Sequence, residues 1–303
     1  MASIRPPDPV REAAGHLCVA ALRLIRRFPP GAVASALRPL LSLYPLLRPA
    51  HARRLRDCFA AAPFTVTIGA YYRQRLELLA RGVRGHGRVR DEARQEGLAH
   101  YENALASGRP VALLGLHAGP FELLHRIPEA PPGRPFRILT TPAFSRRLTA
   151  FMASGREGQG KTVLLVGAEG NRGLERGLRE TADAKGVLAF MVDQHPGKQE
   201  AVATLDLWGR IRVPWPARLL GFLASQDFLC VPISARYGGD GTAVVRYHPP
   251  LAEPDGPAIQ AFLEEAIAAA PGQWNWSYPK VIPVPERNPD GAEAAVPAGE
   301  SRR

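Results

Sequence analysis

His117 and Glu122 form the most distinctive pair of chemically active side chains in the sequence, within the segment LGLHAGPFE at residues 114–122. The apolar run before them, Val111–Leu116, predicts a buried strand, and Phe121–Arg126 predicts a helix. The two side chains can meet if His117 ends the strand and Glu122 lies in the first helical turn, at the sheet edge where α/β proteins bind ligands. A carboxylate beside a histidine fixes its tautomer and makes it a general base. The alternative is a strand-end histidine bonded to backbone, with Glu122 favoured only by the helix N-terminus.

A second candidate site is Gly155–Thr162, which matches the P-loop pattern G-x-x-x-x-G-K-[ST] at Lys161. The apolar run Val187–Asp193 also resembles the strand whose final aspartate holds magnesium in such proteins. A P-loop, however, follows a strand and leads into a helix that begins at the lysine. Here Arg146–Ala153 predicts an amphipathic helix and Thr162–Gly167 predicts a strand. A P-loop nucleotide hydrolase is therefore the alternative function and not the preferred one.

Other machinery for covalent or metal catalysis is not found in the sequence. It contains no G-x-S-x-G nucleophile elbow and no H-E-x-x-H zinc motif. The three cysteines, Cys18, Cys58 and Cys230, are far apart, which excludes a disulfide framework and a cysteine-based zinc site and suits a reducing compartment. We therefore expect no metal and no cofactor, and a group transfer by direct attack of the acceptor, without a covalent enzyme intermediate.

Strand-like and helix-like segments alternate from about residue 108 onwards, which predicts an α/β fold. We expect a mostly parallel or mixed central sheet flanked by helices. The expected strands are Val111–Leu116, Phe136–Thr141, Lys161–Val166, Val187–Val192, Ala203–Trp208, Phe228–Tyr237 and Thr242–Tyr247. The expected helices are Phe121–Arg126, Ser145–Arg156, Asn171–Lys185, Ala217–Ser225 and Pro257–Ala269.

The basic charge is concentrated in the first third of the chain. The 303 residues carry a formal net charge of +11, and residues 1–100 hold 17 Lys and Arg against 7 Asp and Glu. Such a region indicates an anionic partner, either nucleic acid or anionic lipid. No nucleic-acid-binding module accompanies the charge, so we expect no nucleic acid and favour an anionic membrane surface.

The N-terminal segments have the pattern of basic amphipathic helices that lie in a membrane interface. Residues 13–28 place an apolar stripe at helical spacing, with arginines elsewhere on the helix, and a second stretch at 37–47 repeats it. Neither is long enough to span a bilayer, which needs about 20 apolar residues. The alternative is an ordinary amphipathic helix packed on the domain. The first stripe consists of Leu17, Ala20, Ala21, Leu24, Ile25 and Phe28, and the arginines are Arg23, Arg26 and Arg27.

The sequence predicts three regions. Residues 1–60 are expected to be a basic membrane-docking segment with amphipathic helices, and residues 61–283 the catalytic domain. Residues 284–303, rich in Pro, Ala, Gly and Glu, are expected to be a disordered tail.

Four segments of the chain together resemble the bacterial lipid A late acyltransferases (the lauroyl and myristoyl transferases) and their wider lysophospholipid acyltransferase relatives. The resemblance covers residues 100–280. Its segments are SGRPVALLGLH at 107–117 followed by AGPFE, a family-like His-x4-Asp/Glu block; DQHPG at 193–197; FLCVPI at 228–233 with HPP at 248–250; and PGQWNW at 271–276.

This resemblance implies a membrane-associated acyltransferase in which His117 deprotonates an acceptor hydroxyl and Glu122 orients it. The donor would be a fatty-acyl thioester of acyl carrier protein or coenzyme A, and the acceptor a lipid such as a lipid A precursor. Arg156, with Lys161, would grip a substrate phosphate, and Asp193 and Gln194 would contact substrate. The implied location is the cytoplasmic face of the bacterial inner membrane, with peripheral or monotopic attachment.

The chain departs from the family pattern at three places near the expected substrate. Pro120 and Phe121 stand where the family usually has Asn and Trp, Ser277–Lys280 replaces a basic run, and Val213–Pro216 replaces a Thr/Gly-rich turn. The acceptor could therefore be another glycolipid, an aminolipid or a polyene-like lipid. A catalytically silent lipid-binding relative is a further alternative.

Overall fold

The computed structural model places a mixed α/β fold over most of the chain. It describes residues 9–25, 27–29, 32–33, 35–37, 39, 46–84, 93–125, 128–129, 131–143, 145–156, 161–166, 170–193 and 203–284. The expected tail beyond residue 284, and most of the second amphipathic stretch at 37–47, lie outside these residues.

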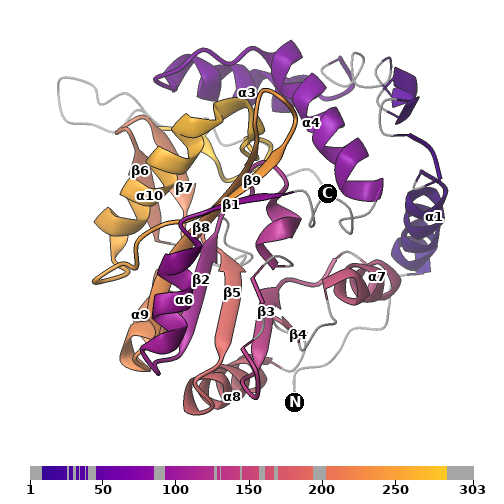
Figure 1. Cartoon of the computed structure of the whole chain (residues 1–303). Helices are drawn as coiled ribbons and strands as arrows, with labels where there is room; N and C mark the ends of the chain where they lie inside the picture. Colours follow the sequence, from indigo (N-terminus) through magenta and orange to yellow (C-terminus); the bar gives the residue numbers. More distant parts are fainter. Residues whose placement is uncertain are drawn as a thin grey trace.

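A seven-stranded sheet forms the centre of the molecule, in the order β1-β9-β8-β2-β5-β3-β4 (Figure 1). Strands β8, β2, β5, β3 and β4 are all parallel, whereas β9 is antiparallel to β8 and β1 is parallel to β9. The expectation of an α/β fold with a mixed sheet is therefore confirmed. The strands are β1 (Arg94–Glu96), β2 (Val111–Gly115), β3 (Phe136–Thr140), β4 (Lys161–Leu165), β5 (Val187–Met191), β8 (Leu229–Tyr237) and β9 (Ala243–Tyr247).

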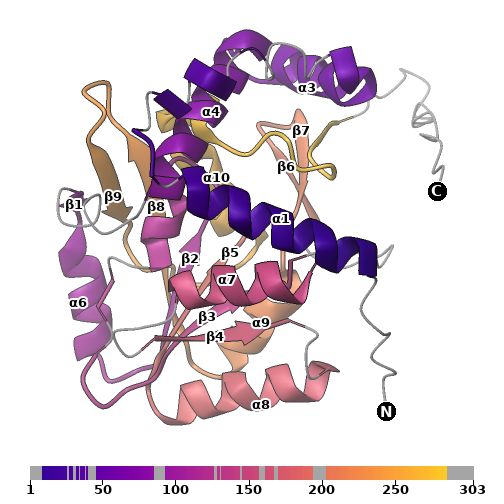
Figure 2. The same ribbon diagram turned by 90° about the vertical axis from the view of Figure 1, so that its right-hand side faces the viewer.

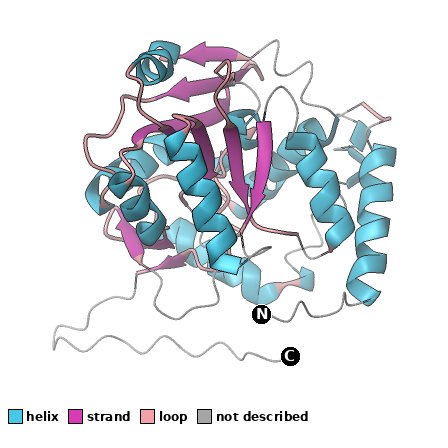
Figure 3. Ribbon diagram, turned by 90° about the horizontal axis from the view of Figure 1, so that it is seen from below, coloured by secondary structure: helices cyan, strands magenta, loops and turns pink. Residues whose placement is uncertain are grey.

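The interior strands of this sheet are apolar along their whole length because helices cover both faces (Figure 3). Every residue of β2 is buried, with Ala112 and Leu114 in one layer of the core and Val111 and Leu113 in the other. The helices are α1 (Pro9–Ile25), α3 (Pro49–Ala61), α4 (Ile68–Arg84), α6 (Leu98–Ala106), α7 (Arg146–Arg156), α8 (Gly170–Asp183), α9 (Ala217–Ser225) and α10 (Gly256–Ala269), with 3-10 turns η1 (Phe121–His125) and η2 (Pro271–Gln273).

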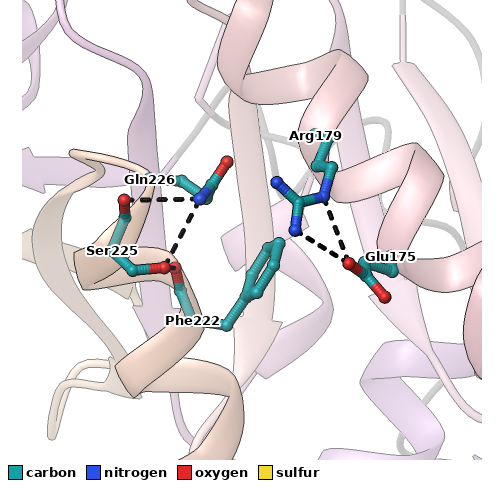
Figure 4. A network of polar contacts seen from close by, with 5 residues as sticks. All are labelled: Glu175, Arg179, Phe222, Ser225 and Gln226. Carbon is teal, nitrogen blue, oxygen red and sulfur yellow. Dashed lines mark hydrogen bonds and ion pairs between the residues drawn. The ribbon is translucent and has the colours of Figure 1, made fainter.

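A small antiparallel sheet, in the order β10-β7-β6, lies beside α10. Its strands are β6 (Thr204–Leu207), β7 (Ile211–Pro214) and β10 (Ile282–Pro283). Helices α8 and α9 lie at the opposite end of the molecule from α3 and α4 (Figure 1). They touch through the Arg179 guanidinium, which lies 5.3 Å from the centre of the Phe222 ring and pairs with Glu175 (Figure 4).

Helix α1 packs against α7, and the two run side by side in Figure 2. The buried face of α1 carries Gly15 and Val19, and a Cβ at Gly15 would overlap the side chain of Ser145. Glu12 adds a polar contact, because its Oε1 accepts a hydrogen bond of 2.8 Å from the backbone N–H of Arg146 at the start of α7. The close approach therefore depends on a glycine at position 15.

The large apolar side chains of α1 lie on the face away from α7. Val10, Leu17 and Leu24 are 75%, 73% and 55% exposed, and Phe28 just beyond the helix is 50% exposed. Residues 10, 17 and 24 are spaced by seven, so they form one stripe along the helix. No helix among the described residues is long and apolar enough to cross a bilayer.

The expected domain boundary at residue 60 falls inside α3, which packs into the main core. Leu55 and Cys58 of α3 are fully buried. The Arg54 guanidinium donates hydrogen bonds to the carbonyl groups of Trp276, Ser277, Tyr278 and Val281. The main α/β domain therefore includes α3 and is better defined as beginning at Pro49.

Candidate active site

His117 and Asp193 meet at the carboxyl ends of two neighbouring parallel strands. Strand β2 pairs in register with β5, and each ends just before one of these residues. The Nδ1 atom of His117 lies 2.8 Å from Oδ1 of Asp193, and the backbone N–H of His117 donates to Oδ2 at 2.9 Å. The indole N–H of Trp274 donates to the same Oδ2 at 2.8 Å.

Asp193 is ionised and acts as an acceptor in this arrangement. The carboxylate is 1% exposed, and burial alone would favour its neutral form. The charge of the facing His117 and the hydrogen bonds from His117 and Trp274 outweigh burial and hold the pKa of Asp193 below its usual value. Because an ionised carboxylate can only accept, Nδ1 of His117 carries a proton, and in the neutral imidazole the lone pair is then on Nε2.

The backbone around His117 is fixed by the C-terminal segment that carries Trp274. Ala118 forms an antiparallel bridge with Trp274, and the carbonyl of His117 accepts from the backbone N–H of Asn275 at 2.9 Å. Gly119 has a φ of +54°, and a Cβ there would lie 2.6 Å from the carbonyl oxygen of Ala235. Glycine is therefore required at this position of the motif for both conformation and space.

His117 keeps access to solvent on its other side. Its side chain is 22% exposed, and within the described chain Nε2 has no hydrogen-bond partner. The ring of Phe121 lies 5.0 Å from the imidazole, centre to centre. The imidazole therefore lies in a partly apolar and partly exposed position.

The expected pairing of His117 with Glu122 is corrected by these contacts, since Asp193 holds the Nδ1 atom. Glu122 instead binds Arg156 with both oxygens, at 3.0 Å to Nε and 2.7 Å to Nη2. Nη1 of Arg156 donates to the hydroxyl of Thr140 at 2.9 Å. This bidentate pair links η1, the end of β3 and the end of α7, and Arg156 is only 9% exposed.

Lys161 lies at the amino ends of the parallel strands, whereas His117 lies at their carboxyl ends. It is the first residue of β4 and pairs in register with Phe136, the first residue of β3. A strand of this length separates its amino end from its carboxyl end by about 15 Å. The lysine is buried, with Nζ 4.9 Å from the centre of the Phe136 ring. The expectation that Lys161 grips substrate beside Arg156 is therefore corrected.

The same geometry argues against a P-loop. Helix α7 comes before the matching segment and β4 begins at Lys161, which is the reverse of the strand-to-helix order that a P-loop needs. Asp193, the residue that would hold magnesium, is engaged by His117 and Trp274. Gln194 lies outside the described residues, so its expected contact with substrate remains a prediction.

Two residues near the site were not given a role from the sequence. Trp274 belongs to a recognised motif, but its hydrogen bond to Asp193 joins residues 81 positions apart. Asn275 places its Oδ1 atom in a buried position where it has no hydrogen-bond partner in the described structure. Both follow η2 within the segment PGQWNW at 271–276, whose two tryptophans are the signal that the sequence offers.

A second histidine, His248, lies between the sheet and α10. His248 is buried, its Nε2 is 2.9 Å from the hydroxyl of Ser234, and its Nδ1 is 3.8 Å from Glu265. Burial lowers the pKa of His248 to about 4, partly offset by Glu265. This neutral, buried imidazole is therefore part of the packed core and is assigned no catalytic role.

Comparison with known proteins adds no family assignment. No protein-family model matches the chain, and no curated protein matches it. Among the described residues, no group of three or more His, Cys, Asp and Glu side chains is arranged to hold a metal ion.

Cys230 has the properties of a core thiol. Burial raises its pKa to about 12, which disfavours the thiolate that a nucleophile needs.

Proposed function

We propose that this protein is a membrane-associated acyltransferase. It moves a fatty acyl group from a thioester of acyl carrier protein or coenzyme A to a hydroxyl of a glycolipid such as a lipid A precursor. The observation that carries the proposal is the His117–Asp193–Trp274 chain of hydrogen bonds at the carboxyl edge of the parallel sheet. In the neutral form of His117, this arrangement places the lone pair on Nε2, the ring nitrogen that does not face Asp193.

The reaction begins when Nε2 of His117 takes the proton of the acceptor hydroxyl. The hydroxyl oxygen then attacks the thioester carbonyl, and Asp193 stabilises the imidazolium that forms. The tetrahedral intermediate collapses by breaking the carbon–sulfur bond, and the departing thiolate takes the proton back from Nε2. An ester and a free thiol result, and the enzyme returns to its starting state without a covalent intermediate.

Arg156 has a supporting part in this proposal. Glu122 and Thr140 use three of its N–H groups and fix the guanidinium plane. The remaining N–H groups can donate to a phosphate of the acceptor or donor. Glu122 thus positions Arg156, and its effect on His117 passes through η1.

Attachment to an anionic membrane would bring the acceptor to the site. The exposed stripe Val10, Leu17 and Leu24 is available for insertion, at about 25 cal/mol per Å² buried. The basic excess of residues 1–100 adds attraction of about 1 kcal/mol for each Lys or Arg near the surface. A helix that only packs on the domain would bury this stripe. Instead, α1 packs on the domain through Gly15 and Val19, and the stripe stays exposed.

Mass spectrometry of lipids tests the activity. Lipid extracts from bacteria with and without the protein should differ by one acyl group on one lipid class, and the purified chain should transfer that acyl group from a thioester donor. His117→Ala should be folded and inactive. Full activity in folded His117→Ala would contradict the role of His117 as general base. A wild-type protein that binds lipid without transferring an acyl group would favour a catalytically silent, lipid-binding relative.

Vesicle sedimentation tests the attachment separately. Leu17→Glu with Leu24→Glu should release the chain from anionic vesicles, because both side chains lie away from α7. Ala224→Glu with Ser225→Glu adds the same charge on exposed positions of α9, far from α1 (Figure 1), and should leave binding unchanged. Equal sedimentation of all three proteins would contradict docking through α1.

A further inference from the structure

A cavity of about 620 Å³ lies on the far side of the tryptophan pair from His117. It is lined by the last half of α3, by residues 62–68 and by Arg210 in the β6–β7 turn. Trp274, which binds Asp193, stacks edge-on against Trp276 at 4.7 Å, and Phe59 and Phe64 of the cavity contact Trp276 at 5.4 and 6.1 Å. These rings separate the cavity, here named the α3 cavity, from the catalytic histidine.

The α3 cavity is an open surface pocket with a mixed polar and apolar lining, and aromatic side chains of the core lie at its base. Phe59 belongs to the main core and is 8% exposed. Phe64 is held between Trp276 and Trp208, the latter at 5.1 Å with nearly perpendicular rings. Val66 and Ile68 extend the apolar lining. The volume falls in the range of about 300–1,000 Å³ that is typical of small-molecule sites.

Two arginines give the cavity a positive charge. Arg56 and Arg210 are exposed, and neither guanidinium has an acidic partner among the described residues. Their neighbour Arg212 differs, because Asp206 neutralises it at 2.8 Å. An unpaired pair of guanidinium groups beside an aromatic floor matches a ligand with an anionic head and an apolar body.

We infer that the α3 cavity binds a single-chain anionic amphiphile. The chain lies against Phe59 and Phe64, and the phosphate or carboxylate head binds Arg56 and Arg210. This site is separate from the His117 centre and does not depend on its proposed activity.

Calorimetric titration of the full chain with octyl phosphate, below its micelle concentration, tests the inference. We expect saturable binding to wild type and at least tenfold weaker binding to the double variant Arg56→Gln, Arg210→Gln. Arg179→Gln is the matched control, because it removes an exposed arginine on α8 at the other end of the molecule (Figure 1, Figure 4), and it should bind like wild type. Equal binding by the double variant would overturn the inference.

Two further ligands test which part of octyl phosphate is recognised, and variants of Thr65 test where it binds. Inorganic phosphate and octyl glucoside should each bind at least tenfold more weakly than octyl phosphate. If either matches octyl phosphate, the cavity does not require both parts and the inference fails. Thr65 is an exposed lining residue, so Thr65→Trp should block the cavity without removing core contacts, whereas Thr65→Ser should not. Undiminished binding by Thr65→Trp would place the ligand elsewhere.

Discussion

Replacing Asp193 with asparagine exchanges one oxygen for an amide nitrogen and should remove the general base. The structure dictates how the new side chain must sit. Two N–H groups, from the His117 backbone and the Trp274 indole, point at Oδ2, so the asparagine oxygen has to take that place. The amide NH2 group then faces Nδ1 of His117.

An NH2 group can donate to Nδ1 only if Nδ1 carries no proton. The imidazole proton therefore moves to Nε2, which loses the lone pair that would accept the proton of the acceptor hydroxyl. Where a serine hydrolase has the same His–Asp relationship, this wrong tautomer lowers kcat by about 10⁴. The same factor here corresponds to about 5 kcal/mol of transition-state stabilisation. The fold should lose less, about 1.5–3 kcal/mol for the charge-assisted hydrogen bond.

Two measurements check the reasoning. ¹⁵N NMR of the His117 ring should show the Nδ1–H tautomer in the wild type and the Nε2–H tautomer in Asp193→Asn, whichever acceptor is used. Turnover should fall by about 10³–10⁴ while circular dichroism stays native. A folded Asp193→Asn that keeps the Nδ1–H tautomer, or that works within tenfold of wild type, would refute the role of Asp193.

Three other expectations follow from the buried charges. Glu122→Ala leaves Arg156 without its carboxylate, so the free energy of unfolding should fall by about 3 kcal/mol in urea denaturation; adding Arg156→Met should recover part of this loss, and a fully additive double variant would contradict the pairing. Because burial lowers the pKa of His248 from 6.5 to about 4, its stabilising effect is present above pH 6.5 and lost as the pH falls towards 4. The loss should be about 2 kcal/mol between pH 7 and pH 5, and denaturation curves of His248→Gln should lack this slope; an unchanged slope would disprove it. Lys161→Ala should have no nucleotide phenotype, since calorimetry should detect no magnesium-dependent ATP or GTP binding to wild type; micromolar binding that Lys161→Ala abolishes would favour the nucleotide hydrolase.

The central strands could be predicted from the sequence because both of their faces are covered. Strands β2, β3, β4, β5, β8 and β9 begin and end within a residue or two of the expected runs. Strand β1 was missed, since Arg94–Glu96 is polar and lies at an edge of the sheet. Its pairing with β9 depends on the backbone and not on an apolar pattern.

The candidate base could be predicted, but its partner could not. Spacing along the chain favours Glu122, the carboxylate nearest to His117 in sequence. The sheet order decides otherwise, because β5 lies next to β2 and brings Asp193 across 76 positions. A single sequence does not reveal which strands are neighbours, so the local motif was assigned the wrong contact. The P-loop alternative at Lys161 could be disfavoured from the sequence, because the expected helix before it and strand after it correspond to α7 and β4.

The reassignment of Glu122 also connects α1 to the end of the sheet where His117 lies. Arg156 ends α7 and binds Glu122, while the start of the same helix is held by Glu12 of α1. Removing residues 1–48 would therefore take away the apolar stripe and also the support of α7, and with it the placement of Arg156. A loss of activity after such a deletion could not be attributed to membrane binding alone. Substitutions at Leu17 and Leu24, which leave the α1–α7 contact intact, separate the two effects.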